Sequence, residues 1–511
     1  MALIHITSSP AAPERSPIPL FDTDNVRQIE LQALAKIQPD EMSLMKRAGL
    51  SLFRLICACY PHARHIWVAA GTGHNGGDAI EAAALLHQAG KHVQVNWLGS
   101  PNRMSVDTAQ AVLAARNSGL ELHSHKYNIT DIPSSVDLII DGLLGIGLDP
   151  QRGLSQRMEQ FITSINQHTA PVVSVDVPSG LPPGTGHAHS ACVRADTTLT
   201  FLCAKPGLFT ADGREYCGDI WLDTLDNVPP DVPPNAYLNG CGNECFSKRA
   251  QNTNKGSHGD VAIVGGATGM TGAAILAGRA AMAAGAGRVY VAPVMPNEDE
   301  PMPVSLDIRH PELMFRPPEL IDIEQCTIVC GCGGGKIIEN VLPPLLKQCL
   351  RLLLDADALN AISESSELQH LLGKRAGTRF STIITPHPLE AARLLHTHTA
   401  DIQANRLAAA QGLATRFQCI CVLKGSGTVI AAPGITPFIN CSGNAALASA
   451  GTGDVLAGWI AGHWSAQLST DKLQKLAAHC VWTHGDAADR WQRVHHSPSI
   501  AASTLLNWLQ Q

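Results

Sequence analysis

The sequence predicts an α/β protein built from two doubly wound domains, each a largely parallel sheet with helices on both faces. Three observations support this fold class. The chain has 511 residues, which is too long for a single hydrophobic core. Short apolar runs recur along it, and most end at a glycine-rich loop that leads into a helix of small residues. A stretch rich in Pro, Asn and Gly interrupts this pattern, so we expect domains at residues 1–235 and 242–511.

Composition limits the class of protein. Hydrophobic residues make up 45% of the chain and charged residues 16%, which is typical of a globular protein. The net charge of −7, without a basic stripe, argues against a nucleic-acid partner. No apolar run reaches membrane-spanning length and the N-terminus lacks a secretory pattern, so we expect no membrane partner and a cytoplasmic location. The 15 cysteines lack C-x-x-C spacing, which favours reduced thiols over a zinc site.

The first half reads as a βαβ unit of a parallel sheet. In order, we expect helices over 23–56 with a break at Pro39, a strand over 66–70, a glycine loop over 71–78, a helix over 79–89 and a strand over 92–98. The loop matches G-x-G-x-x-G at Gly71, Gly73 and Gly76, but the second strand ends at Leu98 without an acidic residue for a ribose. A hydride-transferring dinucleotide enzyme is therefore not favoured.

Polar oxygens follow successive strands of this half. One apolar strand ends at Asp141, the next ends at Asp176 with Ser179 shortly after it, and Asn75 lies in the first glycine loop. The carboxyl ends of parallel strands share one crevice, so we expect these side chains to converge there. Several hard oxygens without His or Cys favour an alkali or alkaline-earth cation. The alternative is that each aspartate merely caps a helix.

Five separated motifs, spanning about Thr23 to Leu225, resemble those of the NAD(P)H-hydrate epimerases. The motifs are Leu44–Gly49, Gly71–Asp78, Asp141–Leu148, Ser174–Gly180, and Ala195–Phe201 with Lys205–Leu208. The resemblance implies a Rossmann-like fold and a potassium ion held by Asn75, Asp141 and Ser179. Two positions depart from the family pattern, because His74 stands where Asn is usual and Ala79 where Gly is usual.

The same resemblance implies a hydrated nicotinamide nucleotide, NAD(P)HX, as the substrate of this half. The implied substrate contacts are His74, Asn75, Gly76, Gly77, Asp78, Gly145, Ile146, Gly147, Leu148, Asp149, Pro150, Gln151 and Asp176. Asp176 stands at a strand end in the glycine-flanked crevice. We therefore hypothesise that Asp176 is the acid/base that interconverts the R and S forms at the hydroxylated ring carbon.

Residues 226–255 are rich in Pro, Asn and Gly, show no apolar period and are expected to form the linker, with the boundary near 235–245.

In the second half we expect a strand over 261–264, a small-residue helix over 273–285, a strand over 288–294, and further strands that end in 329–335, 353–360, 383–388 and 421–428. Gly335-Lys336 is only faintly similar to a P-loop, because the spacing is one residue short and Ile337 replaces Ser or Thr.

The turn Gly451-Thr452-Gly453-Asp454 precedes an apolar helix. Glycines at a helix start leave backbone N–H groups free to bind a phosphate. An aspartate would repel a phosphate, so Asp454 fits better as a base that takes a proton from a hydroxyl group. The alternative is a helix N-cap. Lys424 and Thr428, at another strand end, can bind a nucleotide's phosphates from the other side.

The second half, from about Gly242, resembles the ADP-dependent NAD(P)H-hydrate dehydratases, a branch of the ribokinase-like fold. The matching motifs are Lys255–Gly259, Asp355–Asn360, Thr385–Pro388 with Glu390–Arg393, Lys424–Thr428 and Gly451–Asp454. The departures are Cys332, Gly334, Leu389 and Ala445. The residues implied to touch the hydrated nucleotide are Ala273, Gly333, His387 and Asp454. Those implied to hold ADP, the co-substrate, are Lys424, Gly425, Ser426, Gly427, Thr428 and Gly453.

Together the two resemblances imply a bifunctional repair enzyme, with K⁺ in the first domain, Mg²⁺ on the phosphates in the second, and a homo-oligomeric assembly. The epimerase would interconvert R- and S-NAD(P)HX, and the dehydratase would return the S form to NAD(P)H. One alternative is a ribokinase-like kinase for a vitamin precursor, which would leave a stable phosphorylated product. The other is a first domain that only docks or stabilises and does not catalyse.

Overall fold

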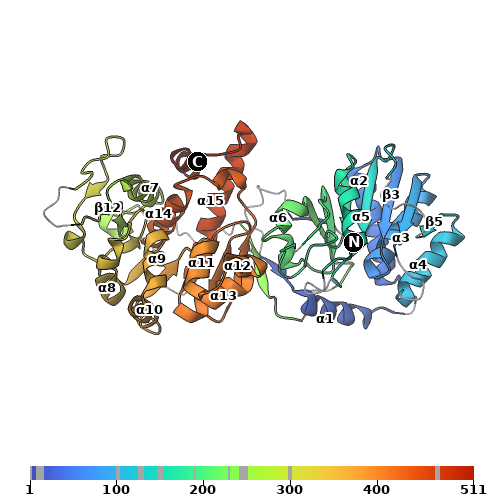
Figure 1. Cartoon of the computed structure of the whole chain (residues 1–511), viewed down its shortest axis with the longest axis horizontal. Coiled ribbons are helices and arrows are strands. Elements are labelled where there is room, and N and C mark those ends of the chain that lie inside the picture. The colour runs from blue at the N-terminus through green and yellow to red at the C-terminus, as the bar shows by residue number, and fades with distance from the viewer. Residues whose placement is uncertain are drawn as a thin grey trace. The chain divides into compact units, whose positions relative to one another are not determined.

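The computed structural model describes residues 3–6, 17–38, 40–98, 104–124, 132–147, 153–188, 190–227, 231–240, 251–296, 302–465 and 472–511. The chain divides into two compact units (Figure 1). One comprises residues 1–11 and 19–236, and the other comprises residues 12–18 and 237–511. Among the described residues, no helix combines the length and the apolar character needed to cross a bilayer.

The first unit contains an eight-stranded sheet in the order β1-β9-β8-β7-β6-β3-β4-β5, parallel throughout except for the pairing of β1 with β9. Its strands are β1 (Ile4–His5), β3 (His65–Ala70), β4 (His92–Trp97), β5 (Leu122–Ser124), β6 (Leu138–Gly142), β7 (Val172–Val175), β8 (Thr197–Phe201) and β9 (Asp219–Asp223). Its helices are α1 (Thr23–Leu34), α2 (Leu44–Cys59), α3 (His74–Gln88), α4 (Val106–Asn117), α5 (Gln156–Gln167) and α6 (Gly213–Tyr216). Strand order reverses direction between β3 and β6, which opens a crevice at their carboxyl ends.

Side chains alternate between the two faces of this sheet, so each face carries its own core. Ile66 and Val68 of β3 pack in a cluster with residues of α2, α3 and α4. Trp67, between them in sequence, packs on the other face with Phe161 of α5. The alternation explains why the strands read as continuous apolar runs, because both faces of a doubly wound sheet are buried.

Helix α3 begins at His74, five residues before the start that the sequence indicated. Asn75, Gly76 and Gly77 therefore lie in its first turn and not in a loop. The two glycines allow this early start because the helix packs closely there. A Cβ at Gly76 would overlap the backbone of Gly71, and one at Gly77 would lie 2.5 Å from the Met45 side chain.

An eleven-stranded sheet in the order β13-β12-β11-β14-β15-β16-β17-β18-β19-β10-β2 belongs to the second unit, except that residues 19–20 of β2 and Ala236 of β10 are assigned to the first. Its strands are β2 (Ile18–Leu20), β10 (Ala236–Asn239), β11 (Asp260–Gly265), β12 (Arg288–Pro293), β13 (Met314–Phe315), β14 (Thr327–Cys330), β15 (Arg351–Leu354), β16 (Ser381–Ile384), β17 (Ile420–Leu423), β18 (Val429–Ala432) and β19 (Ile435–Asn440). The strands from β13 to β17 are parallel, while β18 is antiparallel to both of its neighbours.

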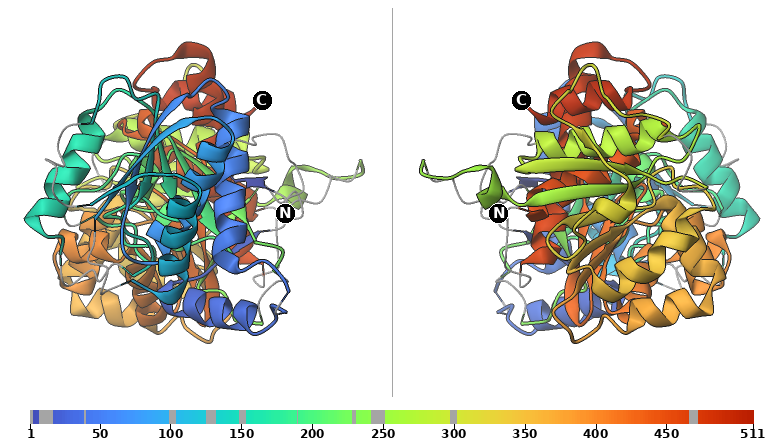
Figure 2. Two further views of the ribbon diagram at one scale, coloured as in Figure 1. Left: turned by 90° about the vertical axis from the view of Figure 1, so that its right-hand side faces the viewer. Right: turned by 90° about the vertical axis from the view of Figure 1, so that its left-hand side faces the viewer.

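Helices cover both faces of this second sheet. They are α7 (Thr271–Ala283), α8 (Ile338–Gln348), α9 (Ala356–Glu364), α10 (Ser366–Gly373), α11 (Pro388–Leu395), α12 (Thr399–Ala404), α13 (Arg406–Phe417), α14 (Thr452–Ser465), α15 (Leu473–His495) and α16 (Ala502–Leu509). The right view of Figure 2 shows the sheet between the red helices α14–α16 on one side and the yellow-to-orange helices α8–α13 on the other. The predicted fold class, two doubly wound α/β domains, is confirmed.

The expected linker is not wholly irregular. Strand β10 lies within residues 226–255 and pairs in parallel with β19, with Tyr237 opposite Phe438. Asn239 anchors the strand, because its amide donates to the side-chain oxygen of Asn440 and to the carbonyl of Ala478. The four-residue run Ala-Tyr-Leu-Asn is too short for an apolar period to be visible, which is why the sequence pattern missed it.

Helices α7 and α14 pack closely enough to set the position of the turn before α14. A Cβ at Gly458 would overlap the carbonyl oxygen of Ala277, and one at Gly462 would overlap that of Ala281. Small residues on both helices thus bring the two backbones into contact. This contact places the first turn of α14, which contains Asp454, beside the carboxyl ends of β14 and β15.

Two candidate active sites

The predicted cation ligands of the first unit come together at the crevice between β3 and β6. Asp141 is fully buried, and its carboxylate accepts hydrogen bonds from the Ser179 hydroxyl at 2.6 Å, the Ser179 N–H at 2.9 Å and the Ser174 hydroxyl at 2.9 Å. Burial raises the pKa of Asp141, and the hydrogen bonds from Ser179 and Ser174 oppose that effect. Asn75 reaches the same place, because its amide donates to the Leu144 carbonyl at 2.9 Å.

One oxygen of this cluster has no partner. The side-chain oxygen of Asn75 is buried and accepts no hydrogen bond in the described part of the chain. A buried acceptor without a donor is costly unless a cation or water satisfies it. The Leu144 carbonyl, 3.3 Å from the Ser179 hydroxyl, adds another oxygen to the group. The donor set therefore fits a hard cation, and Leu144 is a member of it that the sequence reasoning missed.

Asp176 is held in place by a dense set of donors. Its Oδ1 accepts from the Lys205 ammonium, from the Thr200 hydroxyl at 3.1 Å and from the Phe201 N–H at 3.1 Å. Its backbone is left-handed, with φ +63°, a strained conformation for a non-glycine residue that often marks functional sites. Lys205, only 1% exposed, was quoted in a sequence motif, but its pairing with Asp176 could not be foreseen because the two are 29 positions apart.

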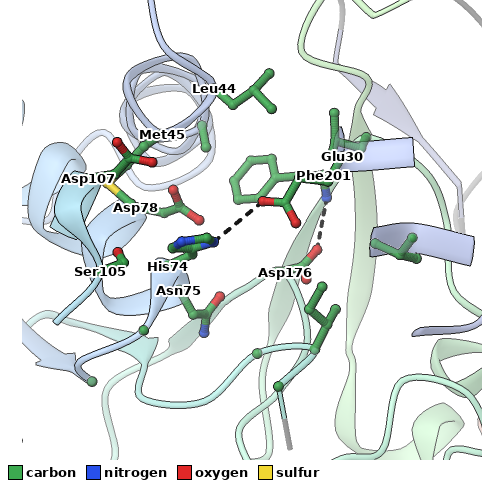
Figure 3. A pocket seen from close by; sticks show the side chains of 18 of the residues that line it. Glu30, Leu44, Met45, His74, Asn75, Asp78, Ser105, Asp107, Asp176 and Phe201 are labelled. Atoms are coloured by element: carbon green, nitrogen blue, oxygen red, sulfur yellow. Dashed lines mark hydrogen bonds and ion pairs between the residues drawn. The ribbon is translucent and has the colours of Figure 1, made fainter. Parts of the chain in front are cut away.

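A cavity of about 940 Å³ opens above these groups (Figure 3). The predicted substrate-contact residues that line it are His74, Asn75, Asp78, Gly145, Ile146, Gly147 and Asp176. Gly76 and Gly77 are buried in the packing of α3 instead. Leu148, Asp149, Pro150 and Gln151 lie outside the described residues. Most of the predicted contacts thus share one cavity, which also receives Glu30 from α1.

His74, the residue that departs from the family pattern, pairs with that glutamate across the cavity rim. Its Nδ1 lies 3.4 Å from a carboxylate oxygen of Glu30 (Figure 3). The hydrogen bond with Glu30 raises the pKa of His74 more than burial lowers it. The pair joins α1 to the first turn of α3, so the departure from Asn introduces a contact with a carboxylate at the cavity mouth.

In the second unit, the turn before α14 is fixed by its own polar groups. Gly451 adopts φ +88°, which favours glycine, and Thr452 begins the helix. The Thr452 hydroxyl donates to the carbonyls of Leu447 and Ser449, at 2.8 and 2.9 Å. The buried ring of His484 donates from Nε2 to the Thr452 carbonyl at 3.0 Å. These bonds fix the carbonyl groups of the turn. The Thr452 N–H donates to the Ser449 carbonyl at 3.4 Å, and the first N–H groups of a helix have no partner within the helix itself.

Asp454 is the third residue of α14, so it does not serve as the helix N-cap. Ligand atoms of Asp454, Asp355 and Cys332 all lie within 4.8 Å of one another. Burial, and then the charge of Asp355, raise the pKa of Asp454 to about 6. A carboxyl group with such a pKa can accept a proton at neutral pH more readily than an ordinary aspartate.

Lys424 lies beside this carboxylate cluster. Its ammonium is 2.6 Å from Asp355 Oδ1. A Cβ at Gly453 would lie 3.5 Å from the Lys424 nitrogen, so the lysine faces the turn before Asp454. The structure therefore brings Lys424, Gly453 and Asp454 together. Asp355, which was quoted in a sequence motif without a role, links Lys424 to Asp454, because it pairs with the lysine and has a ligand atom within 4.8 Å of that of Asp454.

The turn after Lys424 is shaped for close approach of a ligand to its backbone. Gly425 adopts φ +127° and Gly427 φ +63°, and the Thr428 hydroxyl donates back to the Gly425 carbonyl at 3.1 Å. Beneath it, the buried guanidinium of Arg406 donates to the carbonyls of Leu423 and Lys424, at 3.2 and 3.0 Å. Arg406 has no motif around it, and only the fold reveals its contact with the turn.

The remaining predicted contacts occupy neighbouring loops. Gly333 and Ala273 are adjacent, because a Cβ at Gly333 would lie 3.0 Å from that of Ala273. His387 caps α11: its Nδ1 accepts from the N–H groups of Leu389 and Glu390, and its Nε2 lies 3.1 Å from Glu390 Oε1. Burial raises the pKa of Glu390 to about 7 and lowers that of His387.

These two sites define a class of protein: a two-domain enzyme that acts on small molecules, with a cation-type oxygen cluster in one domain and a lysine–carboxylate site at a helix start in the other. Residues 41–207 match the family described as YjeF-related protein N-terminus, and residues 261–511 match NAD(P)H-hydrate dehydratase. The Bifunctional NAD(P)H-hydrate repair enzyme Nnr of Escherichia coli is 34% identical, over 98% of this chain and 95% of that protein. That of Coxiella burnetii is 33% identical, over 96% and 98%.

The chain belongs to the family of bifunctional NAD(P)H-hydrate repair enzymes. The resemblances inferred from the motifs of both halves are thereby confirmed. Among solved structures, the ADP/ATP-dependent NAD(P)H-hydrate dehydratase from Bacillus subtilis, co-crystallised with ATP/Mg²⁺, is 28% identical with a TM-score of 0.43. That similarity covers 52% of this chain and 92% of the other.

Proposed function

We propose that the domain at residues 1–235 epimerises R- and S-NAD(P)HX, and that the domain at 242–511 dehydrates the S form to NAD(P)H with ADP, giving AMP and phosphate. The observation that carries the proposal is the grouping of Asp454, Asp355 and Lys424 at the start of α14. A base, a phosphate-binding cation and helix N–H groups there form a site for phosphoryl transfer to an alcohol.

The proposed dehydratase reaction converts the ring hydroxyl, a poor leaving group, into a phosphate, which is a good one. Hydroxide does not leave the hydrated ring readily, whereas phosphate does. In the proposed reaction Asp454 takes the proton of the ring hydroxyl, and the hydroxyl oxygen attacks the terminal phosphorus of ADP. The N–H groups of Gly451–Gly453 and the Lys424 ammonium stabilise the charge on the transferring phosphoryl group. The phosphate then leaves from the ring carbon, and loss of a proton from the adjacent carbon restores the double bond.

The remaining contacts divide between the two nucleotides. Ala273, Gly333 and His387 are proposed to contact the hydrated nicotinamide nucleotide. The residues proposed to hold ADP are Lys424, Gly425, Ser426, Gly427, Thr428 and Gly453. Mg²⁺ would neutralise phosphate charge, and the Asp355 carboxylate, which has a ligand atom within 4.8 Å of that of Asp454, suits this cation.

In the first domain, we propose that Asn75, Asp141 and Ser179 hold K⁺ and that Asp176 is the base. The unpartnered side-chain oxygen of Asn75 supports the cation, because it needs a positive partner in a buried place. The cavity residues named above would contact the hydrated nucleotide. Buried free cysteines such as Cys330 and Cys421 are consistent with a reducing cytoplasmic location.

The proposal is tested by feeding pure R-NADHX and pure S-NADHX to the full chain, with ADP and ATP in parallel. The wild-type protein should return NADH from both forms with ADP. Asp454→Ala should return NADH from neither, while still converting the R form to the S form. NADH recovery by Asp454→Ala would refute the role of Asp454. Conversion of the R form no faster than its spontaneous rate would show that the first domain is not an epimerase.

A further inference from the structure

The epimerase cavity contains a second carboxyl group in an environment unlike that of Asp176. Asp78 lies in α3 and lines the cavity, while Asp176 lies at the end of β7. Figure 3 shows the Asp78 carboxyl directed from α3 into the space that Asp176 borders from the strand side. A substrate between α3 and the strand ends would therefore meet one carboxyl group on each side.

The two carboxyl groups differ in their partners. Asp176 receives a lysine ammonium, a hydroxyl and a backbone N–H on one oxygen. No hydrogen-bond donor in the described part of the chain reaches the Asp78 carboxyl. Burial and the charges of Asp176, Glu30 and Glu81 raise the pKa of Asp78 well above its usual range, against the charge of Lys205. Two carboxyl groups in such different environments can divide acid and base roles.

Other proton donors near the cavity are less suited to the acid role. The Lys205 ammonium is buried, and it donates to Asp176, to the Thr200 hydroxyl at 2.9 Å and to the Phe201 carbonyl at 2.9 Å, which uses its three protons. His74 is paired with Glu30 at the rim. Asp78 is a half-buried cavity carboxyl that no described neighbour engages, whereas Asp107, which also lines the cavity, is exposed.

We propose, on the basis of the epimerase function proposed above, that Asp78 is the general acid of the epimerisation and works against Asp176 as the general base. Water adds to the reduced ring at a carbon bonded to the ring nitrogen, so the hydrate is a hemiaminal. Such a centre loses its configuration when its carbon–nitrogen bond opens, and the opening needs one group to accept a proton and another to donate one.

The step balances with these two residues alone. Ionised Asp176 removes the hydroxyl proton, the carbon–oxygen bond becomes a carbonyl, and the carbon–nitrogen bond breaks with its electron pair passing to nitrogen. Protonated Asp78 gives its proton to that nitrogen, which leaves an open-chain aldehyde. After rotation about the adjacent single bond, nitrogen attacks the other face of the carbonyl. Asp78 then recovers its proton and Asp176 returns one to oxygen, so no oxidant or further reactant is needed.

The test uses Asp78→Asn in full-length protein that also carries Asp454→Ala, so that the S form accumulates. Asparagine keeps the shape and can donate a hydrogen bond, but it cannot transfer a proton. We expect the rate of R-to-S conversion, followed by chromatography, to fall roughly 10²- to 10⁴-fold. Binding of the S hydrate, measured by calorimetry, should stay within about threefold of the parent, because the contact surface is unchanged.

Glu121→Gln is the matched control, since Glu121 is an exposed carboxyl of the same domain that does not line the cavity. It should leave the conversion rate within about twofold of the parent. Conversion at the parent rate by Asp78→Asn would overturn the acid assignment while the parent still shows that the domain is an epimerase. A fall in rate accompanied by lost binding would also overturn it, because Asp78 would then be only a binding residue. Absence of conversion in the parent would refute the epimerase function itself.

Discussion

Asp454 shows how much a local environment can change one carboxyl group. Its neighbours at the start of α14 are Asp355 and Cys332, and its pKa of about 6 follows from burial and from the charge of Asp355. Lys424 moderates that effect without cancelling it. The residue is ionised at neutral pH and yet more basic than an exposed aspartate, which suits a general base.

This pKa predicts a pH dependence for dehydration of S-NADHX. Below about pH 6 the carboxyl holds a proton and cannot accept another, so kcat/KM should fall roughly tenfold for each further pH unit. Above that value the carboxylate is present and the rate should level off. Initial rates of NADH formation at saturating ADP measure the profile. A rate independent of pH between about 5 and 7 would contradict Asp454 as the base.

The side-chain oxygen of Asn75 is buried and accepts no hydrogen bond among the described residues, so we expect epimerisation in the first domain to depend on K⁺ through this oxygen. Asn75→Ala removes this oxygen and should raise the K⁺ concentration needed for half-maximal epimerisation by at least about tenfold. The same substitution should abolish the rise in thermal midpoint that KCl, compared with choline chloride, gives the parent protein. If the variant responds to K⁺ as the parent does, Asn75 is not a ligand.

At the scale of elements, the contact between α7 and α14 controls the second site. The glycines Gly458 and Gly462 let α14 approach the backbone of α7, and Asp454 is one turn before the first of them. A shift of this helix would move the base relative to Lys424, which is anchored on another element, at the end of β17. Positioning errors of about 1 Å can cost about 10²-fold in rate.

Gly458→Ala should therefore lower the free energy of unfolding by about 1–3 kcal/mol, because the new methyl group overlaps the Ala277 carbonyl. It should also lower dehydratase kcat while leaving R-to-S conversion unchanged. Gly412→Ala is the matched control: it lies in α13, where a Cβ would meet no atom within 4 Å, and should stabilise by about 0.5–1 kcal/mol. Urea unfolding measures both. Equal stability of the two variants would contradict the close-packing argument.

Much of this element-scale organisation could be predicted from the sequence, for a physical reason. Strand ends in α/β proteins share one edge, so Asp141 and Asp176 could be expected together from their positions in the chain alone. The ion pair of Lys205 with Asp176 depends on tertiary folding and leaves no local pattern. The early start of α3 was missed because Gly76 and Gly77, which usually indicate a loop, are here required by close packing.

At the scale of the whole molecule, each unit contains its own sheet, core and candidate site. The S hydrate formed by one site can reach the other through solution. Two variants, each inactive in a different domain, should therefore restore the complete reaction when they are mixed. An equimolar mixture of Asp176→Asn and Asp454→Ala should convert R-NADHX to NADH with ADP, whereas each variant alone should not exceed the spontaneous rate. NADH formation is the readout, and failure of the mixture alone would show that the hydrate must pass within one chain.

The central claim is that the Asp454 site transfers the terminal phosphoryl group of ADP to the hydrate and so regenerates the reduced nicotinamide. The most direct test measures NADH, AMP and phosphate in one reaction of the full-length protein with S-NADHX and ADP. The account predicts equal amounts of all three products. A phosphorylated product that accumulates while AMP forms without NADH would contradict it and would favour a kinase.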